Sequence, residues 1–279
     1  MLFYIFSLSH SLSNYYIIIE KNNILEILMK TIKGLLFDIG GVLYIGDTVI
    51  PGAIETITLL QKEYPMRFVT NTTRRTPQTI LAKLQKMGFP VKEEQLFTAL
   101  NATKDYVKTQ SGTVYTILTD EAEAYFSELT SEKPDFVVVG DAYTNFNYTR
   151  LNTAFRHLTE GANLIAAAKN RYFKDEDGKL SMDAGGFIVA LEYATDTKAL
   201  LIGKPSRDFF HLAVKSMGLK PDEVLMIGDD IESDIKGAMD AGLRAALVKT
   251  GKFQPKDLNR GIKPEVILPD VTALPSLLM

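Results

Sequence analysis

The chain contains no cysteine, and its three histidines lie far apart in the sequence. The absence of cysteine excludes disulfide bonds and thiolate metal sites. His10, His157 and His211 do not show the spacing of a zinc site, so each is interpreted as a surface or packing residue. The net charge of −3 over 279 residues shows no basic excess. We therefore expect no nucleic-acid or polyanionic partner.

The first 28 residues contain no charged residue before Glu20. A secretory signal begins with a basic segment, which is missing here, and Ser, His and Asn interrupt the apolar run that a membrane span would need. The organised chain begins near Met29. We interpret residues 1–28 as an upstream extension outside the native fold, with Met29 as the natural start, and expect no membrane association. A membrane-surface anchor is the alternative interpretation of this segment.

From Met29 onward, short apolar runs alternate with amphipathic helical patterns. Strands are expected at residues 34–37, 66–69, 200–202, 224–227, 245–248 and 266–268, with a second series at 114–118, 136–139 and 164–168 and a hairpin over 172–180. Strands that alternate with helices predict an α/β fold with a doubly wound parallel sheet. We expect residues 29–99 and 198–279 to form this core, and residues 100–197 to form an inserted α/β unit.

Polar residues stand at the carboxyl ends of four of the expected core strands. They are Asp38, Thr70 with Asn71, Lys204, and Asp229 with Asp230 and Asp234. Because parallel strands end at the same edge of a sheet, we expect these residues to converge despite their separation in sequence. Each piece alone also fits a turn, a solvated lysine or a helix cap. Their combination favours a single functional site.

The residue types at these strand ends complement one another in phosphoryl transfer. A carboxylate such as Asp38 can attack phosphorus and form an aspartyl-phosphate. The phosphoryl oxygens then need neutralising groups, which Lys204, hydroxyl and amide donors, and a carboxylate-bound Mg²⁺ would supply. Mg²⁺ takes few protein carboxylates, which suits Asp38 together with Asp229. The sequence therefore predicts a Mg²⁺-dependent site for phosphoryl transfer.

From Ile32 to the C-terminus the chain resembles the haloacid dehalogenase-like hydrolases. The four motifs of that family fall, in order, on Asp38, Thr70, Lys204, and Asp229 with Asp234. The inserted unit looks like the C2 cap of the class IIA branch. The segments FVTNTT, ALEYATDTKA, GKP and MIGDD are similar to the group that contains the phospholysine phosphohistidine inorganic pyrophosphate phosphatase.

The resemblance implies a Rossmann-like core and a cytoplasmic, Mg²⁺-dependent phosphatase that acts on a small phosphorylated molecule. The implied roles are nucleophile for Asp38, metal binding for Asp38, the backbone carbonyl of Gly40 and Asp229, phosphate binding for Thr70, Asn71 and Lys204, and support of the metal ligands for Asp230 and Asp234. C2-capped relatives also lead us to expect a homodimer through the cap.

One position departs from the family pattern. The usual first motif has a second aspartate two residues after the nucleophile, which serves as general acid, and here that position is Gly40. General acid–base catalysis is typically worth about 10²–10⁴-fold. We therefore expect poor turnover of alkyl phosphate esters, whose leaving group needs a proton. Pyrophosphate, acyl phosphates and phosphoramidates have better leaving groups and should be favoured.

Substrate selection by the inserted unit is harder to read from the sequence. Lys169, Arg171 and Asp141 follow expected strands and are candidate specificity residues, although each also fits a solvated loop position. Two other functions stay open. A dehalogenase would use the same aspartate, but Asp229 and Asp234 argue against it because that chemistry needs no metal. The second is a phosphate-ligand or partner-binding protein whose catalysis has decayed.

Overall fold

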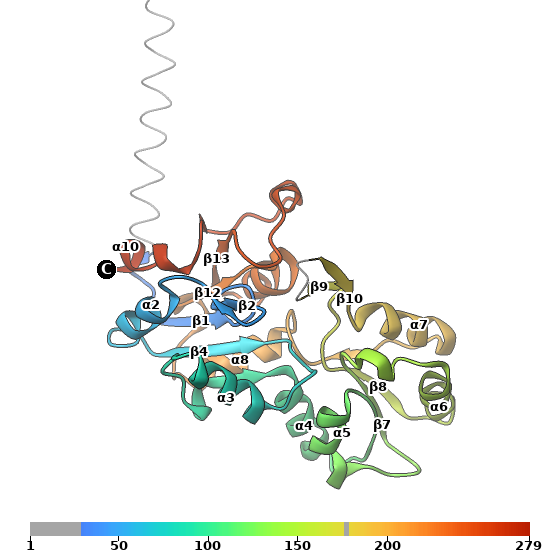
Figure 1. Ribbon diagram of the computed structural model, residues 1–279. Coiled ribbons are helices and arrows are strands. Elements are labelled where there is room, and N and C mark those ends of the chain that lie inside the picture. Colours follow the sequence, from blue (N-terminus) through green and yellow to red (C-terminus); the bar gives the residue numbers. More distant parts are fainter. Residues whose placement is uncertain (1–28, 176–178) are drawn as a thin grey trace, which may run out of the picture.

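The computed structural model describes residues 29–175 and 179–279, which form two α/β lobes side by side (Figure 1). The larger lobe holds a six-stranded sheet and the smaller lobe a four-stranded sheet. Residues 1–28, interpreted above as an extension, and residues 176–178 within the hairpin expected over 172–180 lie outside the described residues. Within those residues, no helix has the length and apolar character that crossing a membrane would require.

The six-stranded sheet is parallel throughout, with the strand order β14-β13-β12-β1-β4-β5. Its strands are β1 (Gly34–Asp38), β4 (Met66–Thr70), β5 (Leu96–Thr98), β12 (Val224–Gly228), β13 (Arg244–Val248) and β14 (Val266–Leu268). β1 lies in the interior of the sheet and is buried along its whole length. Continuous apolar runs are typical of parallel strands that are covered on both faces. The prediction of a doubly wound α/β fold is confirmed.

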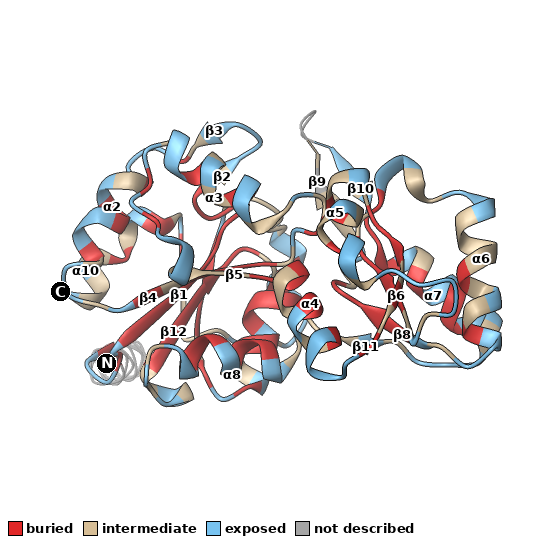
Figure 2. Cartoon of the chain, turned by 90° about the horizontal axis from the view of Figure 1, so that it is seen from below, coloured by how far each residue is buried: buried red, intermediate tan, exposed pale blue. Residues whose placement is uncertain are grey.

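Helices cover both faces of this sheet. They include α2 (Ala53–Leu60), α3 (Pro77–Lys86), α8 (Arg207–Lys215) and α9 (Gly237–Asp240). Successive side chains of a strand point to opposite faces, so Leu35 and Phe37 pack with α2 and α3, whereas Leu36 packs with α8 and α9. Figure 2 shows the buried strands of both lobes between helices whose outer sides are exposed.

The direction in which strands are added reverses beside β1. β4 and β5 follow β1 toward one edge of the sheet, whereas β12, β13 and β14 extend toward the other edge. Open α/β sheets bind ligands outside the carboxyl ends of their strands at such a reversal. Asp38 is the last residue of β1, and Asp229 directly follows the adjacent β12. The fold therefore places both carboxylates at the expected binding crevice.

The smaller lobe, called the cap below, has its own parallel sheet with the order β11-β8-β7-β6. Its strands are β6 (Val114–Ile117), β7 (Phe136–Val139), β8 (Asn163–Ala166) and β11 (Leu200–Leu201). One face packs against α4 (Ala99–Thr109) and α5 (Asp120–Tyr125), and the other against α6 (Tyr148–Thr159) and α7 (Gly185–Thr195). The expected hairpin is present as the antiparallel pair β9 (Tyr172–Lys174) and β10 (Leu180–Met182).

Two strand predictions need correction. β11 does not join the core sheet, because Leu200 pairs with Ile165 of β8 in the cap. A short apolar run indicates a buried strand but not the sheet that it joins. The sixth core strand is instead β5, which runs straight into α4 without turn residues to mark it. Lys204 therefore reaches the site from the end of a cap strand and not from the core sheet.

The remaining elements are short connections. They are the hairpin β2 (Tyr44–Ile45) and β3 (Thr48–Val49), the π-helix η5 (Ile231–Lys236), the C-terminal α10 (Pro275–Leu278), and the 3₁₀ turns η1 (Glu93–Gln95), η2 (Ser127–Leu129), η3 (Tyr143–Asn145), η4 (Pro221–Glu223), η6 (Pro255–Asn259) and η7 (Val271–Ala273). The segment after β12 thus begins as the π-helix η5 and continues as α9.

Candidate active site

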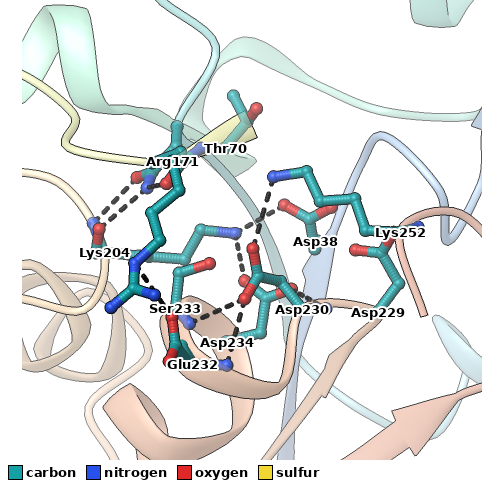
Figure 3. Close-up of polar contacts among 12 residues, drawn as sticks. Asp38, Thr70, Arg171, Lys204, Asp229, Asp230, Glu232, Ser233, Asp234 and Lys252 are labelled. Atoms are coloured by element: carbon teal, nitrogen blue, oxygen red, sulfur yellow. Dashed lines mark hydrogen bonds and ion pairs between the residues drawn. The ribbon is translucent and has the colours of Figure 1, made fainter. Parts of the chain in front are cut away.

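Asp38 and Lys204 form a buried ion pair at the carboxyl end of β1. Asp38 is 8% exposed and Lys204 is 2% exposed. The Nζ atom of Lys204 lies 2.5 Å from Oδ1 of Asp38 and 2.6 Å from Oδ1 of Asp234 (Figure 3). Burial alone would lower the pKa of Lys204, but Asp234 and Asp38 raise it above its usual value. Lys204 is therefore a permanent positive charge beside the Asp38 carboxylate.

Asn71 fixes the backbone of Lys204 from the core side. Its Oδ1 accepts the N–H of Lys204 at 2.8 Å, and its Nδ2 donates to the carbonyl of Lys204 at 2.8 Å. The same Nδ2 donates to Oδ1 of Asn170 in the cap at 3.0 Å. Because the side-chain amide is engaged in this way, Asn71 couples the position of the lysine to both lobes.

Three buried carboxylates, those of Asp38, Asp229 and Asp234, lie close enough to share one cation. One oxygen of each lies within 4.8 Å of the others. Burial, reinforced by Asp38 and Asp234, raises the pKa of Asp229 well above its usual value. Burial also raises the pKa of Asp234 to about 6, with Lys204 opposing the shift and Asp38 adding to it. Crowded carboxylates favour a bound cation, and an oxygen-only donor set suits Mg²⁺.

Glycine is required at two positions beside Asp229. Gly41 (φ +90°) and Gly251 (φ +57°) adopt left-handed conformations, and a Cβ at either position would overlap Oδ2 of Asp229. That oxygen accepts the N–H of Lys252 at 2.6 Å. Gly40 differs, since no atom lies within 4 Å of the place where its Cβ would be. The position of the missing general acid therefore has room for a side chain.

The π-helix η5 holds the acidic residues that follow β12. Asp230 caps its first turn, where Oδ1 accepts the N–H groups of Glu232 and Ser233, each at 3.0 Å. Oδ2 of Asp234 accepts the N–H of Asp230 at 3.1 Å. π-helical turns are rare and often occur at functional sites. Here the turn and its cap leave Oδ1 of Asp234 for Lys204.

A cavity of about 280 Å³ lies over this group, close to the lower end of ligand-pocket volumes, about 300 Å³. Its wall includes every core residue singled out from the sequence, namely Asp38, Gly40, Thr70, Asn71, Lys204, Asp229, Asp230 and Asp234. Thr70 is buried, and its hydroxyl oxygen accepts the N–H of Thr72 at 3.1 Å. The structure thus brings the predicted core residues together around one cavity.

The three candidate cap residues are placed differently. Asp141 lines the same cavity, but its Oδ2 lies 2.5 Å from Nε of Arg74. Lys169 donates to Glu192 at 2.7 Å and lines a neighbouring cavity of about 250 Å³. Arg171 also lines that second cavity, and its side chain is 76% exposed. The structure therefore brings Asp141 to the main cavity, whereas Lys169 and Arg171 lie beside it.

Sequence reasoning missed five charged residues of the main cavity, namely Arg74, Lys83, Asp175, Asp183 and Lys252. Lys252 follows β13, so the strand-end rule that found the other residues could have found it. Arg74 and Asp183 carry no comparable signal, because their placement depends on how the cap docks on the core. The guanidinium of Arg74, for example, lies over the rings of Tyr143 and Phe173, both from the cap.

Comparison with known families gives two matches along the chain. A model described as haloacid dehalogenase-like hydrolase matches residues 35–131, and a second, described as HAD-hydrolase-like, matches residues 201–274. The chain is 43% identical to haloacid dehalogenase-like hydrolase domain-containing protein 2 of Bos taurus, over 82% of this chain and 88% of the relative. It is 36% identical to the phospholysine phosphohistidine inorganic pyrophosphate phosphatase of Homo sapiens, over 81% of this chain and 86% of the relative.

Solved structures show the same architecture. The 4-nitrophenylphosphatase from Thermotoga maritima has a TM-score of 0.83 at 26% identity, covering 90% of this chain and 99% of that chain. NagD from E. coli K-12 has a TM-score of 0.76 at 26% identity, covering 86% of this chain and 97% of that chain. Both similarities extend over core and cap together.

Proposed function

Because the chain belongs to the haloacid dehalogenase-like hydrolases of class IIA and is a phosphatase of that family, we propose that it is a Mg²⁺-dependent phosphohydrolase acting through an aspartyl-phosphate on Asp38. One observation carries the proposal. At the carboxyl end of β1, the buried Asp38 carboxylate forms an ion pair with Lys204 and lies next to the carboxylates of Asp229 and Asp234. The substrate is a small phosphorylated molecule that fits the cavity above this group.

Each part of the group has a role in the proposed reaction. Asp38 attacks the phosphorus, and Lys204 neutralises charge on the phosphoryl oxygens. Asp38, Asp229 and the carbonyl of Gly40 would hold Mg²⁺, with Asp230 and Asp234 supporting them. When bound, Mg²⁺ would withdraw negative charge from the phosphoryl group. Asp234 also keeps the ammonium of Lys204 in place beside Asp38, at 2.6 Å.

Hydroxyl and amide donors follow β4 at the same edge of the cavity. Thr70 and the loop that begins with Asn71 line the cavity beside Asp38. Donors in such a loop can bind the transferred phosphoryl group while the lysine opposes its charge. The side-chain amide of Asn71 already holds the backbone of Lys204. We therefore propose that Asn71 contributes to phosphate binding through the position of its loop and not through a hydrogen bond from its side chain.

Gly40 narrows the range of leaving groups. A glycine provides no acid to protonate a departing alkoxide, so substrates whose leaving group departs without a proton are favoured. We therefore propose pyrophosphate, phosphoramidates and acyl phosphates as the substrate classes. The name of the 36% identical human relative mentions phospholysine, phosphohistidine and inorganic pyrophosphate, which supports this choice.

The test compares purified wild-type protein with Asp38→Asn on pyrophosphate and on an alkyl phosphate, with Mg²⁺ present. We expect a higher kcat/KM on pyrophosphate in the wild type and a loss of at least ~10³-fold in the variant. Thermal unfolding with and without Mg²⁺ checks that Asp38→Asn is folded and reports metal binding separately from turnover. Equal activity of the variant would reject Asp38 as nucleophile.

A phosphate-binding protein with weak catalysis is the second candidate, because Gly40 removes the acid that phosphatases of this family use. It predicts that phosphate or pyrophosphate binds with Mg²⁺ but that no Asp38-dependent turnover follows. A cytoplasmic location and a homodimer through the cap stay predictions, which cell fractionation and light scattering would test. The boundary of core and cap at residue 99 is likewise a proposal, whereas the pairing of β11 (Leu200–Leu201) with β8 extends the cap beyond the expected boundary at residue 197.

A further inference from the structure

Two lysines stand beside the acidic group, and they are held in different ways. Lys204 lies between two carboxylates, at 2.5 and 2.6 Å. The Nζ atom of Lys252 lies 3.3 Å from one oxygen, Oδ2 of Asp230, and its side chain is 20% exposed. Figure 3 shows both ammonium groups directed into the acidic group from different sides. An ammonium has three donors, so Lys252 keeps donors for a ligand.

Lys252 is shared by two neighbouring cavities. The cavity of about 280 Å³ contains Asp38 and Gly40, and the cavity of about 250 Å³ lies next to it. Asn170, Asp230 and Lys252 are among the residues that line both. In the part of the chain that the structure describes, no other lysine or arginine lines both cavities. Lys252 therefore stands where a substrate would extend beyond the phosphorus that Asp38 attacks.

The segment that carries Lys252 is fixed against the loop that carries Gly40. The N–H of Lys252 donates to Oδ2 of Asp229 at 2.6 Å. The hydroxyl of Thr250 donates to the carbonyl of Gly41 at 2.5 Å. Gly251 permits this contact because a side chain there would collide with the Asp229 carboxylate. The lysine thus has a defined backbone position next to the place where the general acid is missing.

We propose that Lys252 binds the leaving group and that this leaving group is itself a phosphate, which makes phosphoanhydrides the preferred substrates. The inference rests on the proposed phosphohydrolase function. An oxygen of Asp38 forms a bond to one phosphorus, and the bond from that phosphorus to the bridging oxygen breaks. The electron pair stays on the bridging oxygen, so the second phosphate departs as an anion and later takes a proton from water. Lys252 stabilises that charge where a general acid would have supplied a proton.

The charge of Lys252 suits this role better than proton transfer would. The ammonium of Lys252 lies 3.3 Å from Oδ2 of Asp230 and therefore acts as a fixed charge beside the site. A leaving phosphate carries charge before and after bond cleavage, whereas a 4-nitrophenyl group brings none, and the charge that it gains spreads over its ring. Loss of Lys252 should consequently affect the two leaving groups unequally.

The test measures kcat/KM of wild type, Lys252→Met and Lys252→Arg on pyrophosphate and on 4-nitrophenyl phosphate, with Mg²⁺. The transferred phosphoryl group is the same in both substrates. We expect Lys252→Met to lose about 10- to 100-fold on pyrophosphate, the range of one hydrogen bond to a charged group, and about twofold on 4-nitrophenyl phosphate. Lys252→Arg keeps the charge and should lose less on pyrophosphate.

Lys83→Met is the matched control, because Lys83 lines the same cavity but binds the carbonyl of Gly46 and the carboxylate of Asp47. It should leave the ratio of the two substrates unchanged. Calorimetry in the Asp38→Asn background gives a readout without turnover. There, adding Lys252→Met should weaken pyrophosphate binding about tenfold, the value of one charged hydrogen bond, and leave 4-nitrophenyl phosphate binding unchanged.

The outcomes separate this inference from the proposed function. Equal losses on both substrates, with a higher Mg²⁺ requirement, would mean that Lys252 only supports Asp229 and Asp230, and would overturn the inference while the phosphohydrolase stands. A wild-type protein that turns over neither substrate would overturn both. A loss confined to pyrophosphate, restored in part by Lys252→Arg, supports a leaving-group site for phosphate.

Discussion

The core side and the cap side of the cavity hold their charges in different ways. On the core side, Asp38, Asp229 and Asp234 are each 8% exposed or less and are arranged around the buried Lys204. On the cap side, Arg171 lies beside this cavity and lines the neighbouring one, and its side chain is 76% exposed. Burying charges costs solvation free energy, so a protein that keeps several of them together commonly uses them for chemistry. The contrast assigns catalysis to the buried core charges. The shape of the cavity and the contacts with the leaving group are left to the residues around them.

The largest effect is expected for Lys204→Met, which removes the positive charge at the centre of the core side. Asp38 and Asp234 would then face each other in a buried site without their partner. We expect kcat/KM to fall by about 10²–10³-fold, and the free energy of unfolding without Mg²⁺ to fall by about 3–5 kcal/mol. Steady-state kinetics and urea unfolding measure the two effects. Mg²⁺ should recover part of the stability, since a cation can replace the lost charge.

Lys204→Arg is the control for that experiment. It keeps the positive charge but changes its shape, so stability should fall less than in Lys204→Met while kcat/KM still drops. If Lys204→Met unfolds at the same urea concentration as the wild type in the absence of Mg²⁺, the ion pairs of Lys204 do not stabilise the folded protein. The difference between the core side and the cap side would then have no basis in stability.

The core side could be predicted from sequence because its residues follow a general rule. Asp38, Thr70 and Asp229 stand at or directly after the ends of core strands, and parallel strands end at one edge. Lys204 obeys the rule only in part, since its strand belongs to the cap sheet and the hydrogen bonds of Asn71 bring its backbone to the site. The sequence identified the motif that contains Lys204, but it did not show that the lysine reaches the site from a strand of the cap.

The cap side could not be predicted in the same way. Arg74 lies against Asp141 and over Phe173, and both contacts depend on how two separately folded sheets dock. Local sequence carries no signal of such docking. The pairing of Lys169 with Glu192 joins residues of the same lobe across a loop and a helix, and from sequence alone Lys169 looked equally suited to a substrate. Strand ends are predictable, whereas the partners of loop charges are not.

The second prediction tests how closely the backbone packs around Asp229, by comparing Gly41→Ala with Gly40→Ala. A methyl group at Gly41 meets the Asp229 carboxylate, and its backbone conformation is unfavourable for alanine. We expect a loss of about 1–3 kcal/mol in stability together with a large loss of Mg²⁺-dependent activity. At Gly40 the space is open, so alanine there should change stability by less than about 0.5 kcal/mol. Similar melting temperatures for the two variants would contradict the packing described around Asp229.

The third prediction sharpens the contrast by adding an acid to the core side. Gly40→Asp has room for its side chain and restores the family's usual residue. We expect kcat/KM on an alkyl phosphate to rise by about tenfold or more, toward the ~10²–10⁴-fold that general acid catalysis provides. The gain on pyrophosphate should be much smaller, because its leaving group departs without that proton. Gly40→Asn fills the same space without the acid and should show no such gain. An equal gain on both substrates would indicate improved folding or metal binding instead.

The smallest effect on activity is expected on the cap side, at Lys169. Its Nζ donates to both oxygens of Glu192, at 2.7 and 2.8 Å, and Oε1 of Glu192 also accepts the N–H of Ala199 just before β11. Lys169 thus ties α7 to the end of the cap sheet. Lys169→Met should cost about 1–2 kcal/mol in unfolding free energy, while kcat/KM on pyrophosphate stays within about twofold of wild type.

Glu192→Gln separates a structural from a substrate-binding role of Lys169. If the pair only stabilises the cap, the double variant should be little less stable than either single variant, because both changes remove the same contact. If Lys169 instead binds an anionic substrate, Lys169→Met would lower kcat/KM without loss of stability, and Glu192→Gln would raise it by freeing the lysine. That result would mean that the cap takes part in substrate recognition. Activity and stability measured together therefore decide which side of the cavity selects the substrate.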